Sequence, residues 1–315
     1  MKAMQFNIIG LGNIGLRYIE SIRSNDINSK IICYDIDINY KKRLIEFLKK
    51  NKLSIENIIF CISISDFFEK INNESVVLIT TTAINRKEII ISCAKMNPSL
   101  IITEKLVVDS RSIYESLLNS LESIRFKNIL VNFFPRNQVF FRDYIKKYIR
   151  DKNFKMHINI PNLGLACNGI HFFDLFLSLS NSNKYKILDS FYLKTYSQKR
   201  EGFFDFSGGI KVESNNCVLS IIDDLSYSSN FISIYCDEDS FHYYMIDEIM
   251  IKLNNEKSEV FNFKLNHVSN YIYHEVDSFL KTGKSNLPNI IESLKSHEIL
   301  FDFIERLKLN NIKIT

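Results

Sequence analysis

Three glycines near the start of the chain constrain its fold more than any other feature. Gly10, Gly12 and Gly15 form the motif GLGNIG in a chain that has only nine glycines among 315 residues. The motif follows an apolar run at 4–9, which predicts a strand, and opens a helical pattern over 13–23. In this context a G-x-G-x-x-G motif predicts a dinucleotide-binding turn, with a pyrophosphate at the positive N-terminus of the helix.

An acidic residue about twenty positions beyond the glycines supports this interpretation. Asp35 lies at the end of KIICYDI, the second predicted strand, where a carboxylate accepts the ribose hydroxyls of NAD and repels the 2′-phosphate of NADP. No Arg or Lys directly follows it, so we expect NAD rather than NADP. Asp37 is an alternative for the same role, and a structural turn followed by a surface Asp is the alternative to a cofactor site.

The order of predicted elements indicates two kinds of sheet. In the first part of the chain, Val/Ile-rich strands alternate with helices, a pattern typical of a parallel sheet covered on both faces. These elements are strands at 4–9, 30–36, 55–61, 76–81, 99–105 and 127–134, and helices at 13–23, 38–51, 86–96 and 109–123. Beyond about residue 150 few helices separate the strands, which predicts an antiparallel sheet. Its elements are strands at 157–160, 187–196, 202–210, 216–222, 229–236, 241–246 and 258–264, and helices at 169–180 and beyond 267.

The bulk composition excludes several classes of protein. Hydrophobic residues make up 46% and charged residues 24% of the chain, and a net charge of +4 without long Lys/Arg runs gives no nucleic-acid footprint. Neither a signal-peptide pattern nor an apolar run long enough to span a membrane occurs. The six cysteines are scattered without a CxxC pair and HExxH is absent, so we expect reduced thiols, a cytoplasmic location and no metal site.

Lys105 ends an apolar predicted strand, SLIITEK, at 99–105. Ligands of open parallel sheets bind beyond the carboxyl ends of the strands, so a lysine at this edge can reach a nicotinamide and a substrate oxygen. A lysine that only extends its charge into water from a strand end is the alternative.

The segment NGIHFFDLFLSLS places polar residues in an otherwise nearly apolar run. On a helix over 169–180, His171, Asp174 and Ser178 share one face, because they are spaced at i, i+3 and i+7. This narrow polar stripe suits a helix buried nearly all round with one strip facing a cleft, and an imidazole in the first turn can act as a base near neutral pH. An ordinary amphipathic helix is the alternative.

Together these segments resemble the Gfo/Idh/MocA family of NAD(P)-dependent oxidoreductases, which includes glucose–fructose oxidoreductase and inositol 2-dehydrogenase. The resemblance covers essentially the whole chain and is carried by GLGNIG, Asp35, TEK (103–105), VNFFPR (131–136), NGIHFFDL (168–175) and the C-terminal LPNIIESLKSHEIL. It implies a Rossmann NAD-binding domain over 1–126 and an α+β substrate and oligomerisation domain over 127–315 with an open, mostly antiparallel sheet. The last helix, about 288–308, is expected to pack back towards the first domain.

The resemblance also implies roles for individual residues. His171 gives or takes the hydroxyl proton during hydride transfer, Lys105 positions and polarises the substrate oxygen, and Asp174 binds a sugar hydroxyl or orients His171. The cofactor-binding set is Gly10, Gly12, Asn13, Ile14, Gly15, Asp35, Thr80, Thr81, Thr82, Glu104 and Lys105. Arg136 and Asn168 are the residues expected to contact the substrate.

Two positions depart from the family pattern. The proline that follows the lysine in the family is Leu106 here, which leaves the direction of Lys105 open, since proline fixes the backbone at such a turn. The Pro-Asn and His that the family often has after strand four are replaced by Thr82-Ala83-Ile84-Asn85-Arg86. The nicotinamide contacts of that loop are therefore open as well.

These inferences predict an NAD-dependent oxidoreductase that transfers hydride between nicotinamide and a hydroxyl or carbonyl group of a sugar, polyol or nucleotide-linked sugar. A role in making surface polysaccharide sugars follows by family analogy alone. A catalytically weak dinucleotide-binding sensor or scaffold, and an NAD-assisted elimination or glycoside cleavage, are the alternatives. We expect no nucleic-acid or membrane partner, and a homodimer or homotetramer formed through the second-domain sheet, where the aromatic-rich strands of 231–244 are expected to expose one face.

Overall fold

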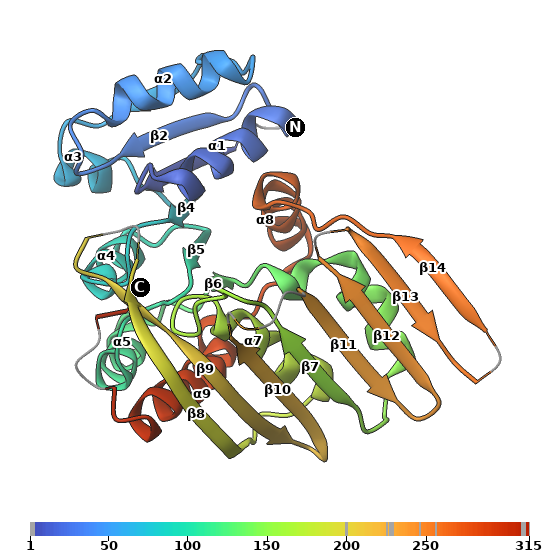
Figure 1. Cartoon of the computed structure of the whole chain (residues 1–315). Helices are drawn as coiled ribbons and strands as arrows, with labels where there is room; N and C mark the ends of the chain where they lie inside the picture. Colours follow the sequence, from blue (N-terminus) through green and yellow to red (C-terminus); the bar gives the residue numbers. More distant parts are fainter. Residues whose placement is uncertain are drawn as a thin grey trace. The chain divides into compact units, whose positions relative to one another are not determined.

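The computed structural model describes residues 4–198, 201–224, 226, 230–245, 247–255, 257–309 and 313–314. The chain forms two compact units (Figure 1). The first unit comprises Met1–Phe134 and Asn266–Glu292, and the second comprises Pro135–Leu265 and Ser293–Thr315. The expected boundary after residue 126 differs from this division, because the strand that follows it and the segment 266–292 both belong to the first unit.

Within the described residues, the first unit contains a six-stranded parallel sheet in the order β3-β2-β1-β4-β5-β6. Its strands are β1 (Gln5–Ile9), β2 (Lys30–Tyr34), β3 (Ile58–Phe60), β4 (Ser75–Ile79), β5 (Leu100–Glu104) and β6 (Ile129–Asn132). Strands β4 and β5 are buried along their whole length, as expected for central strands covered on both faces. The predicted parallel sheet is thus confirmed.

Helices connect the strands of this sheet: α1 (Asn13–Asn25), α2 (Tyr40–Lys50), α3 (Ile64–Glu69), α4 (Arg86–Lys95) and α5 (Arg111–Ile124). Helices α1 and α2 contact each other, and so do α4 and α5. Right-handed crossovers place these pairs on opposite faces, because the chain runs from β1 to β3 in one direction and from β4 to β6 in the other. The direction reverses between β1 and β4, which is where open α/β sheets bind ligands.

The segment 266–292 completes the hydrophobic core of the first unit. It contains a 3₁₀ turn and helix α8 (Ile272–Thr282), which both contact α1. Its side chains that share the core of β1 and α1 are Val268, Tyr271, Ile272, Val276 and Leu287. Packing, rather than position along the chain, therefore assigns this segment to the first unit. The last helix, α9 (Ile290–Arg306), begins in this segment and continues in the second unit.

The described strands of the second unit form one sheet in the order β14-β13-β12-β11-β7-β10-β9-β8. They are β7 (Lys155–Asn159), β8 (Lys186–Ser197), β9 (Phe204–Ser214), β10 (Cys217–Asp223), β11 (Phe231–Cys236), β12 (Asp239–Tyr244), β13 (Ile249–Leu253) and β14 (Ser258–Asn262). Neighbours pair antiparallel, except that β7 and β10 are parallel. The prediction of an open, mostly antiparallel sheet is confirmed.

Aromatic contacts hold helical segments against this sheet. Phe140, in a π-helical segment, contacts Tyr243 of β12, and Phe303 of α9 contacts Phe206 of β9. Helix α7 (Gly169–Ser180) contacts β10. Because side chains alternate along a strand, the residues next to Tyr243 and Phe206 in sequence point to the other face of the sheet. Tyr244 on that face is exposed, and the expected oligomer through this face stays a prediction.

The sequence pattern did not reveal every described element. It missed the six-residue helix α3, the π-helical segment Phe140–Ile145 and strand β13. A helical segment of fewer than two turns shows no periodicity that can be recognised in a sequence. The predicted helix over 169–180 matches α7 at both ends. Positions 229 and 246, which were predicted to lie in strands, fall outside the described residues.

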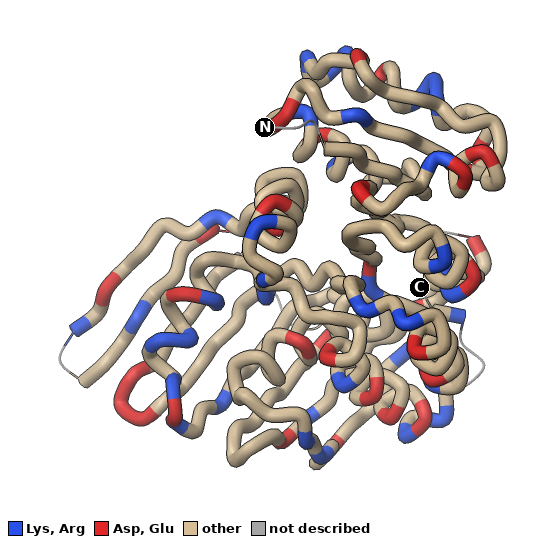
Figure 2. Tube along the Cα trace, turned by 180° about the vertical axis from the view of Figure 1, so that it is seen from behind, with Lys and Arg blue, Asp and Glu red and all other residues tan. Residues whose placement is uncertain are grey.

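Charged residues of both signs are interspersed along the Cα trace of each unit (Figure 2). Within the part of the chain that the structure describes, no helix combines the length and apolarity needed to cross a membrane. The same residues hold no cluster of three or more His, Cys, Asp and Glu side chains suited to a metal ion.

Candidate functional site

The glycine loop, residues 10–15, joins β1 to α1, and its glycines have different surroundings. Gly10 has φ +93°, and a Cβ there would lie 2.8 Å from the Thr80 carbonyl carbon. A Cβ at Gly15 would overlap the Gly10 carbonyl oxygen, whereas one at Gly12 would meet no atom of the described residues within 4 Å. The chain itself therefore requires Gly10 and Gly15, and Gly12 leaves open space, as expected where a ligand approaches the backbone.

The open part of the glycine loop also presents backbone donors. Gly12, Asn13 and Ile14 are exposed, and Gly12, which precedes the first residue of α1, has no side chain that could cap the helix. The first N–H groups of a helix have no partner within the helix, and they form the positive end of its dipole. The loop thus offers both room and N–H donors to an anion such as a pyrophosphate.

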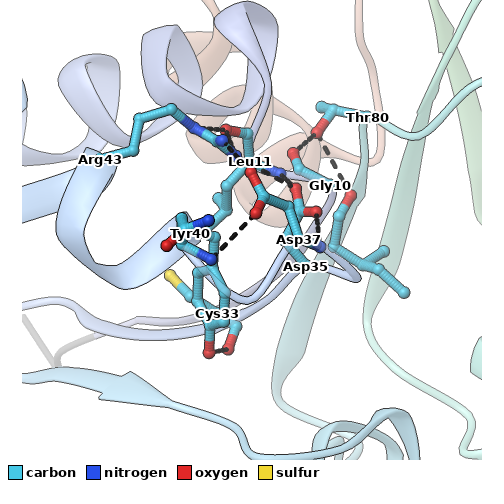
Figure 3. A network of polar contacts seen from close by, with 10 residues as sticks. Gly10, Leu11, Cys33, Asp35, Asp37, Tyr40, Arg43 and Thr80 are labelled. Carbon is cyan, nitrogen blue, oxygen red and sulfur yellow. Dashed lines mark hydrogen bonds and ion pairs between the residues drawn. The ribbon is translucent and has the colours of Figure 1, made fainter.

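Asp35 is tied directly to the glycine loop (Figure 3). Its Oδ2 accepts a hydrogen bond from the Leu11 N–H, and its Oδ1 accepts one from the Asp37 N–H at 2.8 Å. A carboxylate has about four lone-pair sites, so each oxygen retains capacity for a further donor. The predicted ribose-binding carboxylate therefore lies beside the loop predicted to hold the pyrophosphate, which is the arrangement that an adenosine ribose requires.

Arg43 is a charged residue beside the glycine loop that the sequence pattern did not identify. It lies in the first turn of α2, and its Nε and Nη2 donate to the Leu11 carbonyl oxygen at 3.2 and 3.0 Å. Its Nη1 forms an ion pair with Asp37, and its Nη2 lies 3.8 Å from Asp35 Oδ2. Spacing along the sequence could not find it, because only the path of the chain through α2 brings this side chain back to the glycine loop.

Thr80 connects the end of β4 to the same loop. Its hydroxyl donates to the carbonyl oxygen of Gly10 and lies 3.2 Å from that of Ile9. The Thr81 hydroxyl donates to the Thr82 carbonyl oxygen at 3.3 Å, and both residues are half-buried. The Thr80 hydroxyl is thus used to hold the loop, while contacts of the three threonines with a cofactor stay a prediction.

Exposed isoleucines follow the carboxyl ends of the neighbouring strands β2 and β3. Ile36 and Ile38 are each 90% exposed, and Ile62 is 94% exposed. Strands β2 and β3 are parallel neighbours, with Cys33 opposite Phe60, so the residues that follow them lie at the same edge. Apolar side chains this exposed offer a surface to the flat face of a base such as adenine.

Glu104 belongs to a buried hydrogen-bond network at the end of β5. Its Oε1 accepts from the Tyr18 hydroxyl and from Asn132 Nδ2 at 2.7 Å, and the Tyr271 hydroxyl donates to Asn132 Oδ1 at 2.8 Å. Burial raises the pKa of the Glu104 carboxyl, and the bonds from Asn132 and Tyr18 oppose this rise. The network anchors the backbone that leads to Lys105. The predicted contact of Glu104 with a cofactor stays a prediction.

Arg86 holds the turn that carries Lys105. Its guanidinium is buried and donates to the carbonyl oxygens of Thr81, Glu104 and Leu106, with 2.5 Å to that of Glu104. The Lys105–Leu106 peptide bond is cis, and Lys105 is half-buried. The guanidinium, on the first residue of α4, thus connects the carboxyl ends of β4 and β5 around Lys105.

Replacing Arg86 with alanine is expected to lower the free energy of unfolding by about 2–4 kcal/mol, because buried carbonyl groups lose charge-assisted hydrogen bonds. Urea unfolding followed by circular dichroism measures this loss. Arg86→Lys keeps the charge and should lose less. The neighbouring Lys87, bonded to Ser116 Oγ at 2.7 Å, is the control, and Lys87→Ala should change stability by less than about 1 kcal/mol. An Arg86→Ala protein as stable as wild type would contradict the anchoring role.

Helix α7 carries the predicted His171 and Asp174 in the second unit. The helix is buried nearly all round; His171 is half-buried and Asp174 is only 3% exposed. An ion pair joins Asp174 Oδ1 to Arg136 Nη1 at 3.3 Å. Asn168 precedes the helix, and its Nδ2 donates to the Leu163 carbonyl oxygen at 2.6 Å. Two residues that the sequence assigned to separate roles, Arg136 and Asp174, thus form one pair.

The chain enters α7 through a loop held by buried aspartates. Asp205 Oδ1 accepts from the Ala166 N–H at 2.8 Å, and Asp223 Oδ2 accepts from the Gly164 N–H at 2.9 Å. Burial raises the pKa of both carboxyls, and their backbone N–H partners oppose the rise. These bonds anchor the start of the helix that bears His171. Sequence reasoning missed them because both aspartates lie on strands far along the chain.

No protein-family model matches the sequence, and no curated protein matches it. Solved structures do match over nearly the whole chain. UDP-N-acetylglucosamine 3-dehydrogenase GnnA from Acidithiobacillus ferrooxidans shares 10% identity at a TM-score of 0.72, covering 98% of this chain and 99% of that one. An oxidoreductase from Agrobacterium radiobacter, in complex with NAD+, L-tartaric acid and magnesium, shares 12% identity at a TM-score of 0.74, covering 98% and 97%.

A Gfo/Idh/MocA family oxidoreductase from Vibrio cholerae is also similar, with 13% identity, a TM-score of 0.71 and coverage of 98% of this chain and 99% of that one. One of these similar structures is thus of the family that the sequence motifs resemble. At such low identity the likeness establishes the fold: a Rossmann unit combined with an open, mostly antiparallel sheet.

Proposed function

We propose that this chain is an NAD-dependent oxidoreductase that transfers hydride between nicotinamide and a hydroxyl or carbonyl group of a sugar, polyol or nucleotide-linked sugar. The glycine loop carries this proposal: Gly12 leaves open space, the N-terminus of α1 is exposed, and Leu11 is bonded to Asp35. These features fit a dinucleotide, which needs close backbone approach, N–H donors and a ribose-binding carboxylate. The nucleotide-sugar dehydrogenase and the NAD+-bound oxidoreductase among the similar structures support the same class.

In this proposal the first unit binds and orients the cofactor. The N-terminus of α1 binds the pyrophosphate, Asp35 accepts the adenosine ribose hydroxyls, and Thr80, Thr81 and Thr82, in the loop after β4, line the cofactor. The bound cofactor supplies a hydride donor or acceptor. The first unit therefore holds the dinucleotide in one orientation and keeps a 2′-hydroxyl beside Asp35.

Lys105 and His171 are the proposed groups for the substrate oxygen and the proton. The Lys105 ammonium, at the turn held by Arg86, stabilises negative charge on the reacting oxygen. The His171 imidazole takes the hydroxyl proton in oxidation and returns it in reduction. Asp174, paired with Arg136, is proposed to orient His171 or to bind a sugar hydroxyl, and Asn168 to contact the substrate.

The experiment that tests this proposal is a fluorescence titration with NADH and, in parallel, NADPH. The chain has no Trp, so cofactor emission is measured without an indole background. Turnover is then measured with UDP- and TDP-linked sugars and with free polyols, following both cofactor redox state and product mass. Tight NADH binding with net NAD reduction or NADH oxidation supports the proposal.

Other outcomes of this experiment select the alternatives. Binding without any turnover indicates a sensor or scaffold. Product formation without a net change in cofactor redox state indicates NAD-assisted elimination or glycoside cleavage. Failure to bind either cofactor would remove the basis of the proposal.

A further inference from the structure

A guanidinium lies beside the carboxylate that is proposed to bind the adenosine ribose. Asp35 Oδ2 accepts the Leu11 N–H, while Arg43 Nε and Nη2 donate to the carbonyl oxygen of the same residue (Figure 3). Arg43 Nη2 and Asp35 Oδ2 are 3.8 Å apart. A sugar hydroxyl or phosphate that reaches Asp35 therefore also comes within reach of Arg43.

A second carboxylate, that of Asp37, forms an ion pair with this guanidinium. Asp37 forms an ion pair with Arg43 Nη1, and Asp37 Oδ1 accepts the Asn39 N–H at 2.9 Å. The Asp37 N–H is itself bonded to Asp35, so the short turn between β2 and α2 fixes where Asp37 lies. The Arg43 and Asp37 side chains are 39% and 41% exposed, which leaves the pair open to a ligand.

The charges at this turn bear on the choice between the two nicotinamide cofactors. With Asp35 and Asp37 ionised and Arg43 protonated, the group carries a net negative charge, which repels a dianionic 2′-phosphate. A 2′-hydroxyl meets no such repulsion and can donate to Asp35. Without the Asp37 charge, the same guanidinium would be a good partner for a phosphate, because Arg donates several N–H bonds to phosphate oxygens.

We propose that the Arg43–Asp37 pair sets the choice of NAD over NADP, an inference that rests on the proposed function of the glycine loop. Arg43 is placed to take a 2′-phosphate, and Asp37 withholds it. Specificity then comes from a repulsive element as much as from the attractive Asp35. Removing the Asp37 charge alone is therefore expected to strengthen NADPH binding.

The test is the affinity of Asp37→Asn for NADPH and NADH, measured by cofactor fluorescence without substrate. Asparagine keeps an oxygen for the Asn39 N–H but removes the charge that pairs with Arg43. We expect the Kd for NADPH to fall roughly three- to tenfold and that for NADH to change by less than about twofold, because Asp35 is untouched. The gain should shrink between about 0.05 and 0.5 M salt, since exposed charges are screened.

Two matched variants control this measurement. Asp37→Asn combined with Arg43→Gln keeps a donor for the Leu11 carbonyl oxygen but lacks the cation, and it should lose the NADPH gain. Asp277→Asn removes the same charge from the partly exposed Asp277–Lys281 pair of α8 and should leave both Kd values unchanged.

The outcomes separate this inference from the function on which it rests. A wild type that binds NADH, with no NADPH gain in Asp37→Asn, overturns the inference and leaves the proposed function standing. A gain that persists without Arg43, or a wild type that prefers NADPH, also overturns it. A wild type that binds neither cofactor overturns the proposed function and this inference together.

Discussion

Replacing His171 with alanine is expected to lower kcat by about 10²–10⁴-fold while the Kd for NADH stays unchanged. Positioned general acid–base groups contribute rate factors of about this size. His171 lies on α7 in the second unit, whereas the residues proposed to bind the cofactor belong to the first. Removing the imidazole therefore leaves the glycine loop intact. Turnover with the best substrate of the sugar screen and an NADH titration measure the two effects.

A matched histidine variant controls for general effects of losing an imidazole. His274 is exposed on α8, so His274→Ala should retain both turnover and NADH affinity. The pH dependence of kcat adds a second readout, because loss of the acid–base group should remove the limb that its protonation produces. Full activity of His171→Ala would defeat the assignment.

Gly15→Ala is expected to destabilise the first unit and to abolish NADH binding. The new Cβ would overlap the Gly10 carbonyl oxygen. This oxygen belongs to the backbone, so no side-chain rotation can relieve the overlap. Relieving the overlap requires α1 to move away from β1, so the loop loses the shape that a pyrophosphate needs. We expect the free energy of unfolding to fall by about 1–3 kcal/mol, the usual cost of overpacking. Urea unfolding and NADH titration of the same preparation test this.

Gly12→Ala is the matched comparison, with the same added methyl group on the same loop. No atom of the described residues lies within 4 Å of that position, so stability should change by less than about 1 kcal/mol. The methyl group occupies the space through which a ligand approaches, and we expect NADH affinity to fall about tenfold or more. Equal stability of Gly15→Ala and Gly12→Ala would contradict the steric assignment, and unchanged NADH affinity in Gly12→Ala would contradict the ligand assignment.

Local patterns in the sequence predicted most of the first unit, because each of its strands and most of its helices show a hydrophobic pattern within their own residues. An apolar run with a glycine turn and a helical period identifies β1 and α1 without knowledge of any partner. The patterns missed α3, whose six residues are fewer than two turns, and they did not show that the segment 266–292 belongs to the first unit. Helix α8 has an ordinary amphipathic sequence, and nothing in that sequence states which core its apolar face will cover.

Some features of the candidate site were likewise predicted from the sequence, and others were shown only by the tertiary structure. The positions of Gly10, Gly12 and Gly15, the carboxylate at Asp35 and the helix that bears His171 follow from the sequence by itself, because a tight turn, a strand end and helical spacing are local properties of the chain. The tertiary structure alone decided that Arg43 reaches the Leu11 carbonyl oxygen, Arg86 that of Glu104, and Arg136 the Asp174 carboxylate. Each arginine has a long side chain, and its carboxylate or carbonyl partner is supplied by the way the chain folds back rather than by a characteristic spacing. The place of Arg43 at the glycine loop, and with it the proposed cofactor preference, therefore depends on the tertiary fold.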